Sequence, residues 1–294
     1  MKNMKNMTAK VSCFARAYHH KHNDVHIFDD YAAEQLLGEE YDQIAQNMTG
    51  GVSFFFPEFK GTPEEGLRLI ADRQLSPSVL ARSAYCEKML DNERRLGCRQ
   101  YILFASGYDT YSIRNDDGEL SVFELDLPDI LSDKRERIEK AGLKSNANYV
   151  PCDLATDLWK VKLEQSGFKF HDKSFGSLLG ISYYLSRDEF RNLLCGVSGI
   201  MAKGSAICFD YPSDDESKES KTNRMLAQGA GEKMKAMYSY SELELLLHEC
   251  GFLIYEHLDN EEMTKQYFSD YNNANPEHGM QAPEGVAYIM AVRT

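Results

Sequence analysis

The spacing of apolar residues along the chain changes near Gly97. Before this point, apolar positions recur at roughly helical spacing, which predicts a cap of helices. One helix is expected to open at residues 28–31 and run towards Asn47, a second to begin at the capping box of residues 62–65, and a third to run from Ser76-Pro77 to Leu96-Gly97. We therefore assign residues 1–97 to an N-terminal helical cap.

After Gly97, short apolar runs alternate with amphipathic stretches, which is the pattern of successive βα units. The expected strands are residues 100–105, 121–125, 147–151, 175–181, 206–211, 252–257 and 287–292. This order predicts an α/β fold for residues 98–294: a Rossmann-like, doubly wound, mostly parallel sheet of seven strands with helices on both faces.

A charged stretch interrupts this predicted core at about residues 212–238. Connections of such length in a compact domain are usually functional or mobile. Three methionines in it, Met225, Met234 and Met237, are interpreted either as part of a flexible lid over an apolar substrate or as packing for a neighbouring helix.

Composition narrows the classes of function. The 294 residues are 43% hydrophobic and 27% charged, as in a globular chain with a sizeable core. The 46 acidic and 33 basic residues give a net charge of −13, which disfavours nucleic acid and anionic membranes as partners. Because no apolar run suits a membrane span or a signal peptide, we expect a cytoplasmic protein. The 7 widely spaced cysteines are expected to be reduced and mostly buried.

A glycine turn followed by an acidic residue indicates a nucleotide-type ligand. The apolar run of residues 101–105 leads into Ser106-Gly107, where a glycine lets a ligand approach the backbone. Asp126 follows the next strand, about 20 residues after Gly107, where an acidic side chain can bind a ribose diol. The residues alone leave open a structural alternative, in which the turn only reverses the chain and the acidic side chain caps the helix that begins at Pro128.

Further segments support the ligand-binding interpretation. They are residues 80–82, 105–110 with Arg114, 123–128 with Lys134, 150–154 and 179–185. Together they resemble the leucine carboxyl methyltransferase superfamily, which includes carboxyl methyltransferases of the tetracenomycin type. The resemblance covers roughly residues 11–200. It implies a class I methyltransferase that uses S-adenosylmethionine (SAM) and releases S-adenosylhomocysteine (SAH).

The resemblance also implies roles for individual residues. Arg82 would pair with the methionine carboxylate of SAM, Asp126 would hold the ribose hydroxyls, and Asp153 and Leu154 would meet the adenine ring. The remaining cofactor contacts would come from the turn and strand ends at Ala105, Ser106, Gly107, Leu127 and Leu179. The resemblance also places Arg16 near a basic position of the cap that contacts the cofactor carboxylate. Arg82 as a surface charge and Asp153 as a plain helix cap remain open alternatives.

Two of these positions depart from the family pattern. The family usually has glycine where this chain has Ala105, so we expect the alanine to be tolerated only with a negative φ. It usually has an acidic residue in place of Leu179, and a lost hydrogen bond to a charged group costs about 1.5–3 kcal/mol. The two departures predict a weakened cofactor site, or one rebuilt around the new residues.

The acceptor and the catalytic group are less constrained. A carboxylate nucleophile needs no base, whereas a hydroxyl would, so no catalytic residue is assigned. His22, Tyr183 and Tyr184 are candidate substrate-binding residues. His22 and His26 have a helical spacing that suits metal ligands, but no third ligand of matching context follows, so no metal is predicted.

The leading hypothesis is a SAM-dependent O-methyltransferase that acts on a carboxylate or hydroxyl of a small, polyketide-like acceptor. One alternative is a regulatory or ligand-binding relative that has lost turnover, and another is a methyltransferase for the C-terminal carboxyl group of a protein. A nicotinamide-dependent dehydrogenase is disfavoured because the turn lacks the three-glycine fingerprint. A homodimer is compatible with all of these hypotheses.

Overall fold

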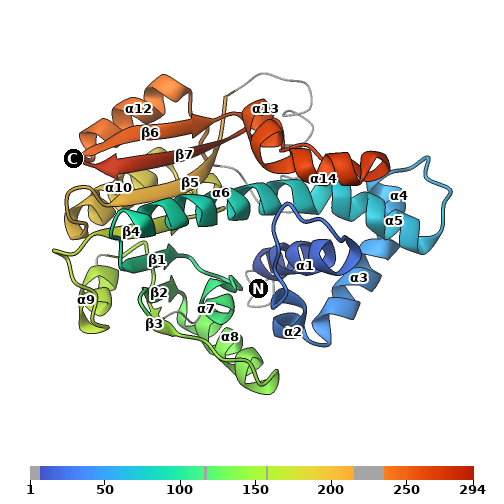
Figure 1. Ribbon diagram of the computed structural model, residues 1–294, viewed down its shortest axis with the longest axis horizontal. Helices are drawn as coiled ribbons and strands as arrows, with labels where there is room; N and C mark the ends of the chain where they lie inside the picture. The colour runs from blue at the N-terminus through green and yellow to red at the C-terminus, as the bar shows by residue number, and fades with distance from the viewer. Residues whose placement is uncertain (1–6, 116–117, 157, 215–234) are drawn as a thin grey trace.

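The computed structural model describes residues 7–115, 118–156, 158–214 and 235–294, which fold around one seven-stranded sheet (Figure 1). The strands are β1 (Gln100–Phe104), β2 (Ser121–Asp126), β3 (Ala147–Pro151), β4 (Ser174–Leu178), β5 (Ala206–Pro212), β6 (Phe252–Leu258) and β7 (Val286–Arg293). All seven predicted strands are confirmed. The predicted fourth strand was too long, because the structure ends β4 before Gly180, whose φ of +68° belongs to a turn.

The strand order is β3-β2-β1-β4-β5-β7-β6, and only β7 runs antiparallel to its neighbours. β2 and β3 follow β1 in order across one half of the sheet, and β4 then pairs with the opposite edge of β1. Ligands of open α/β sheets bind outside the carboxyl ends of the strands at such a reversal point. The topology therefore directs attention to the turns after β1 and β4.

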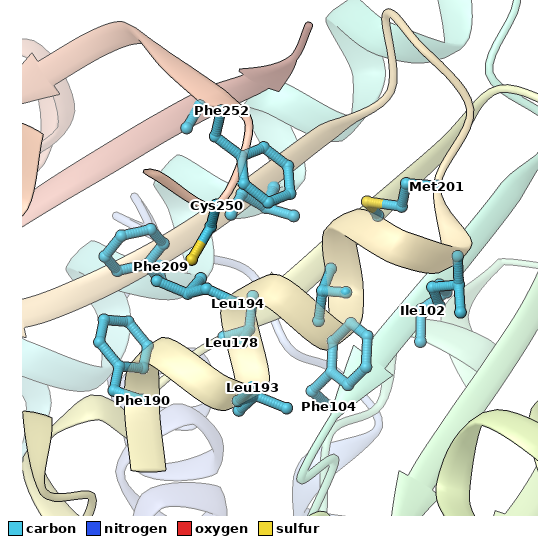
Figure 2. Packing of buried hydrophobic residues seen from close by; sticks show 14 of the residues in the cluster. Ile102, Phe104, Leu178, Phe190, Leu193, Leu194, Met201, Phe209, Cys250 and Phe252 are labelled. Carbon is cyan, nitrogen blue, oxygen red and sulfur yellow. The ribbon is translucent and has the colours of Figure 1, made fainter. Parts of the chain in front are cut away.

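Helices cover both faces of the sheet (Figure 1). Alternate residues of β1 point to opposite faces: Ile102 and Phe104 join one apolar cluster, and Tyr101 and Leu103 join another. The first cluster also contains residues of α9 (Leu158–Gln165), α10 (Arg187–Ile200) and α12 (Tyr240–Glu249). Figure 2 shows part of it, including Leu194 of α10 and Phe209 of β5.

The second face is covered by α6 (Ser76–Arg95) and by the C-terminal helices α13 (Asn260–Met263) and α14 (Ser269–Ala274), with the π-helical turn η3 (Thr264–Phe268) between them. The shorter remaining elements of this half are α7 (Tyr111–Arg114), α8 (Pro128–Lys140) and the 3₁₀ turns η2 (Ser182–Tyr184) and η4 (Pro276–His278). All seven cysteines are free, and six are buried, as predicted. No helix among the described residues is long and apolar enough to cross a membrane.

The N-terminal helices agree only in part with the prediction. The capping box at Thr62 is present and begins α5 (Pro63–Ile70), which continues through the π-helical turn η1 (Ala71–Leu75) into α6. The predicted helix from Phe28 to Asn47 is wrong. The chain there forms α2 (Ala33–Leu37) and α3 (Glu40–Gly50), separated at Gly38, whose φ is +57°. α4 (Val52–Phe55) follows α3.

The pattern of apolar residues also missed the first helix, α1 (Met7–His22). Seven consecutive residues of α1, 13–19, are buried, and they include Arg16 and His19. Such a helix shows little amphipathic periodicity, because it is enclosed on several sides and its polar side chains have internal partners. The predicted insertion at residues 212–238 lies mostly outside the described residues, as do Met225 and Met234.

Candidate functional site

A cavity of about 800 Å³ lies at the carboxyl ends of β1, β2 and β4, between the sheet and the helices α1 and α6. This volume is in the upper part of the range for small-molecule sites. Its lining residues come from six segments of the chain: Met7, Thr8, Ala9, Ser12 and Arg16; Arg82 and Ser83; residues 103–109; Asp126, Leu127 and Ile130; Ser177, Leu179, Gly180, Ile181 and Tyr184; and Lys235. The cavity therefore occupies the reversal point of the sheet.

The turn after β1 forms one wall of the cavity. Gly107 has a φ of +51°, and Ala105 has a φ of +55°, the only positive φ among the described non-glycine residues. The expectation that Ala105 would have a negative φ is therefore wrong, and the turn keeps the left-handed conformation that a glycine would adopt freely. Ser106 lies between them, and its Oγ is buried with no hydrogen-bond partner. A buried hydroxyl of this kind, on a cavity wall, is available to a ligand.

Asp126, at the end of β2, is oriented by the backbone. Its Oδ2 accepts a hydrogen bond from the Gly107 N–H and its Oδ1 from the Leu127 N–H, both at 2.7 Å. Burial raises the pKa of Asp126 above its ordinary value, although the two backbone donors oppose the rise. Each carboxylate oxygen can accept a second hydrogen bond. Asp126 is thus a fixed acceptor on the cavity wall, suited to a ligand that presents hydroxyl groups.

Two arginines of the cap reach the cavity, and they differ in how firmly they are held. Arg16 donates from Nε to Asp30 and from Nη2 to the carbonyl oxygen of Tyr108, both at 2.7 Å. Arg82 lies 3.6 Å from Asp210 and donates to the Ser12 hydroxyl at 3.4 Å. Because its contacts are longer, Arg82 retains more donor capacity for a carboxylate of a ligand.

Asp210 on β5 organises the turn after β4, and sequence reasoning did not single it out. It is fully buried and accepts hydrogen bonds from the Gly180 N–H at 2.7 Å and from the Tyr183 hydroxyl at 2.9 Å. These bonds fix the turn in which Leu179 and Tyr184 line the cavity, while Tyr183 supports the turn from outside the lining. An acidic residue within an otherwise apolar strand was the available signal.

The structure does not bring every predicted residue to the cavity. Asp153 and Leu154 are outside the lining, and Asp153 is exposed, with Oδ1 accepting from the Ala155 N–H as in a local turn. His22 is at the far end of α1 from Ser12, about 15 Å away along a helix with 1.5 Å per residue. It stacks on Tyr18, with the ring centroids 4.2 Å apart.

The residues that do line the cavity fit SAM. Asp126 suits the ribose hydroxyls, Arg82 suits the methionine carboxylate, and Ser106 contributes an unpartnered hydroxyl from a turn that exposes backbone. Leu179 supplies an apolar wall in place of a polar contact. The cofactor contacts expected of Arg82, Asp126 and the turn after β1 therefore stay predictions that the arrangement of the cavity supports.

Comparisons with known proteins indicate the same cofactor. The family model for leucine carboxyl methyltransferases matches residues 9–198. YktD of Bacillus subtilis, named as a candidate SAM-dependent methyltransferase, is 37% identical over 99% of both chains. A relative from Mycolicibacterium smegmatis with a similar name is 32% identical over 51% of this chain and 52% of its own length.

Solved structures share the fold at low identity. The magnesium protoporphyrin IX methyltransferase of Synechocystis, crystallised with SAH, has a TM-score of 0.51 and 10% identity, with coverage of 87% of this chain and 100% of that one. A protein of the DUF574 family from Streptomyces avermitilis has a TM-score of 0.57 and 11% identity, with coverage of 96% and 97%. From the family match and the full-length relative, the chain belongs to the leucine carboxyl methyltransferase family and is a SAM-dependent methyltransferase.

Proposed function

We propose that the protein is an O-methyltransferase that methylates a carboxylate oxygen of a small, polyketide-like acceptor. SAM, when bound, supplies a methyl group on a positively charged sulfur that a nucleophile can displace in line. The protein's task is to hold the acceptor close to the methyl group and to exclude water. In this proposal Asp126 binds the ribose and Arg82 the methionine carboxylate of the cofactor, and the wall formed by Leu179, Ile181 and Tyr184 receives the acceptor.

The observation that carries the proposal is the lack of a free general base among the cavity-lining residues that the structure describes. No histidine is among the described residues of the lining. Lys235 does line the cavity, but its Nζ donates to Glu189 at 3.0 Å. The Asp109 carboxylate is held by the backbone, since its Oδ1 accepts a hydrogen bond from the Tyr111 N–H at 2.7 Å. A carboxylate is already ionised near neutral pH and needs no proton removed, whereas a phenol or alcohol would.

The cavity also favours a small acceptor with apolar surface. Asp126 and Ser106 lie on the side of β1 and β2, while the wall after β4 is formed by Leu179, Ile181 and the exposed edge of Tyr184. This wall offers few hydrogen-bonding groups and so suits a hydrophobic or aromatic body. A hydroxyl acceptor is the second candidate, and it would require Lys235 to leave Glu189 and act as the base.

The test uses SAM labelled with tritium in its methyl group and a panel of aromatic carboxylic acids matched with the corresponding phenols. Methyl esters are hydrolysed by mild alkali and release labelled methanol, whereas methyl ethers are stable. We expect alkali-labile product from carboxylic acids, and its loss in Asp126→Asn. Label that survives alkali, or that appears only with phenols, would contradict the proposed carboxylate acceptor.

A further inference from the structure

Three potential metal ligands meet on the surface of the cap, outside the cavity. His20 is in the last turn of α1, and His26 and Asp29 are in the loop that joins α1 to α2. One ligand atom from each lies within 4.8 Å of the others. His20 Nδ1 is 2.5 Å from Asp29 Oδ1, and His26 Nδ1 is 3.9 Å from the same oxygen. The two imidazole rings stack with centroids 5.2 Å apart.

A backbone contact orients one of the imidazoles for coordination. His26 Nε2 lies 3.1 Å from the carbonyl oxygen of His20. A carbonyl can only accept a hydrogen bond, so Nε2 carries a proton, and in the neutral imidazole Nδ1 keeps its lone pair for a metal. Histidines that bind metals are commonly held in this way, with the second ring nitrogen donating to a carbonyl or carboxylate.

We propose that His20, His26 and Asp29 form a binding site for a divalent transition metal of the zinc class, with water in the remaining position. Two imidazoles and one carboxylate are a ligand set that zinc accepts in sites with three protein ligands. Ligand atoms of a tetrahedral zinc site are about 3.3 Å apart, as follows from metal–ligand distances near 2.0–2.1 Å. The separations of 2.5 and 3.9 Å lie on either side of this value, and Asp29, whose side chain is 56% exposed, is free to adjust.

The metal would hold the loop that joins α1 to α2 against the last turn of α1. Asp30, the neighbour of Asp29, is fully buried and binds both Arg16 and the Thr110 hydroxyl at 2.7 Å. Arg16 lines the cavity. Coordination of Asp29 would thus restrict the loop that holds Arg16, so the site has a structural role rather than a part in methyl transfer.

The experiment measures metal binding directly and so does not depend on the proposed acceptor. The full chain, without an affinity tag and after dialysis against a chelator, is titrated with Zn²⁺ by calorimetry and with Co²⁺ by visible absorption. We expect one ion per chain, with affinity reduced by about tenfold or more in His26→Ala and in Asp29→Asn. His22→Ala is the matched control, because His22 is in the same turn of α1 but outside the trio, and it should bind Zn²⁺ as the parent does.

Absence of Zn²⁺ binding by the parent protein would overturn the proposal. So would unchanged affinity in Asp29→Asn, which retains the shape of an exposed side chain and should fold even if His26→Ala does not. Loss of affinity in His22→Ala together with normal affinity in Asp29→Asn would place the ion on His22 and His26 and would also refute the trio.

Discussion

Replacing Ala105 with glycine should relieve strain in the turn that lines the cavity after β1. With a φ of +55°, the Cβ of Ala105 crowds its own backbone, at a cost of roughly 1–2 kcal/mol. The substitution also gives the unfolded chain more freedom, which opposes the gain by about 0.4–1 kcal/mol. The net change in the free energy of unfolding is then between about zero and 1.6 kcal/mol in favour of the variant.

A matched control isolates the strain. Ala141 is exposed at the end of α8, where its φ is −79°, so Ala141→Gly carries the same entropic penalty without any strain to relieve. The entropic contribution cancels between the two variants, and Ala105→Gly should be the more stable by about 1–2 kcal/mol.

The assay is urea unfolding followed by the fluorescence of Trp159, the single tryptophan, which is buried against Phe104 of β1. Ala105→Gly should raise or preserve the unfolding midpoint, and Ala141→Gly should lower it. Equal losses in the two variants would refute the reasoning, because they would show that the turn after β1 imposes no penalty on alanine.

Three further predictions concern the cavity and its support. Arg82→Ala should weaken SAM binding by about tenfold or more, since hydrogen bonds to charged groups contribute about 1.5–3 kcal/mol. Arg95→Ala, on the exposed face of α6, should leave the SAM affinity measured by calorimetry unchanged. Because burial raises the pKa of Asp126, the carboxylate is protonated at a higher pH than an ordinary aspartate, and SAM affinity should begin to fall at that higher pH on acidification. Calorimetric titrations between about pH 4.5 and 7 test this, and Asp126→Asn should abolish the pH dependence. Lys134→Met should lower the free energy of unfolding by about 3–5 kcal/mol, because Glu124 would stay fully buried without its counter-ion, whereas Lys140→Met at an exposed position of α8 should change the urea midpoint little.

The strands were predictable because each is a short apolar run bounded by turn residues, and parallel strands covered on both faces cannot avoid that pattern. Once the strands are placed, the turns at their carboxyl ends are placed too. This is why the sequence could predict that Ser106, Gly107 and Asp126 lie at one edge of the sheet. Asp210 was harder to recognise, because its interactions are with Gly180 and Tyr183, which precede it by about one βα unit.

The first helices of the N-terminal cap could not be predicted from the spacing of apolar residues. α1 buries Arg16 and His19 among apolar residues because Asp30 and the backbone of Ile27 partner them, and these contacts depend on the folded loop. The same applies to His20 and His26, which are six residues apart, do not share a helix, and meet only because the loop after α1 turns back.

Calorimetric titration with SAH tests the central claim, that the cavity at the ends of β1 and β2 is the cofactor site. The matched variants are Asp126→Asn in the cavity and Asp129→Asn, an exposed carboxylate in the first turn of α8. The account predicts one SAH bound per chain by the parent and by Asp129→Asn, with affinity lower by about tenfold or more in Asp126→Asn. No binding by the parent up to about millimolar SAH, or equal affinity in all three proteins, would contradict it.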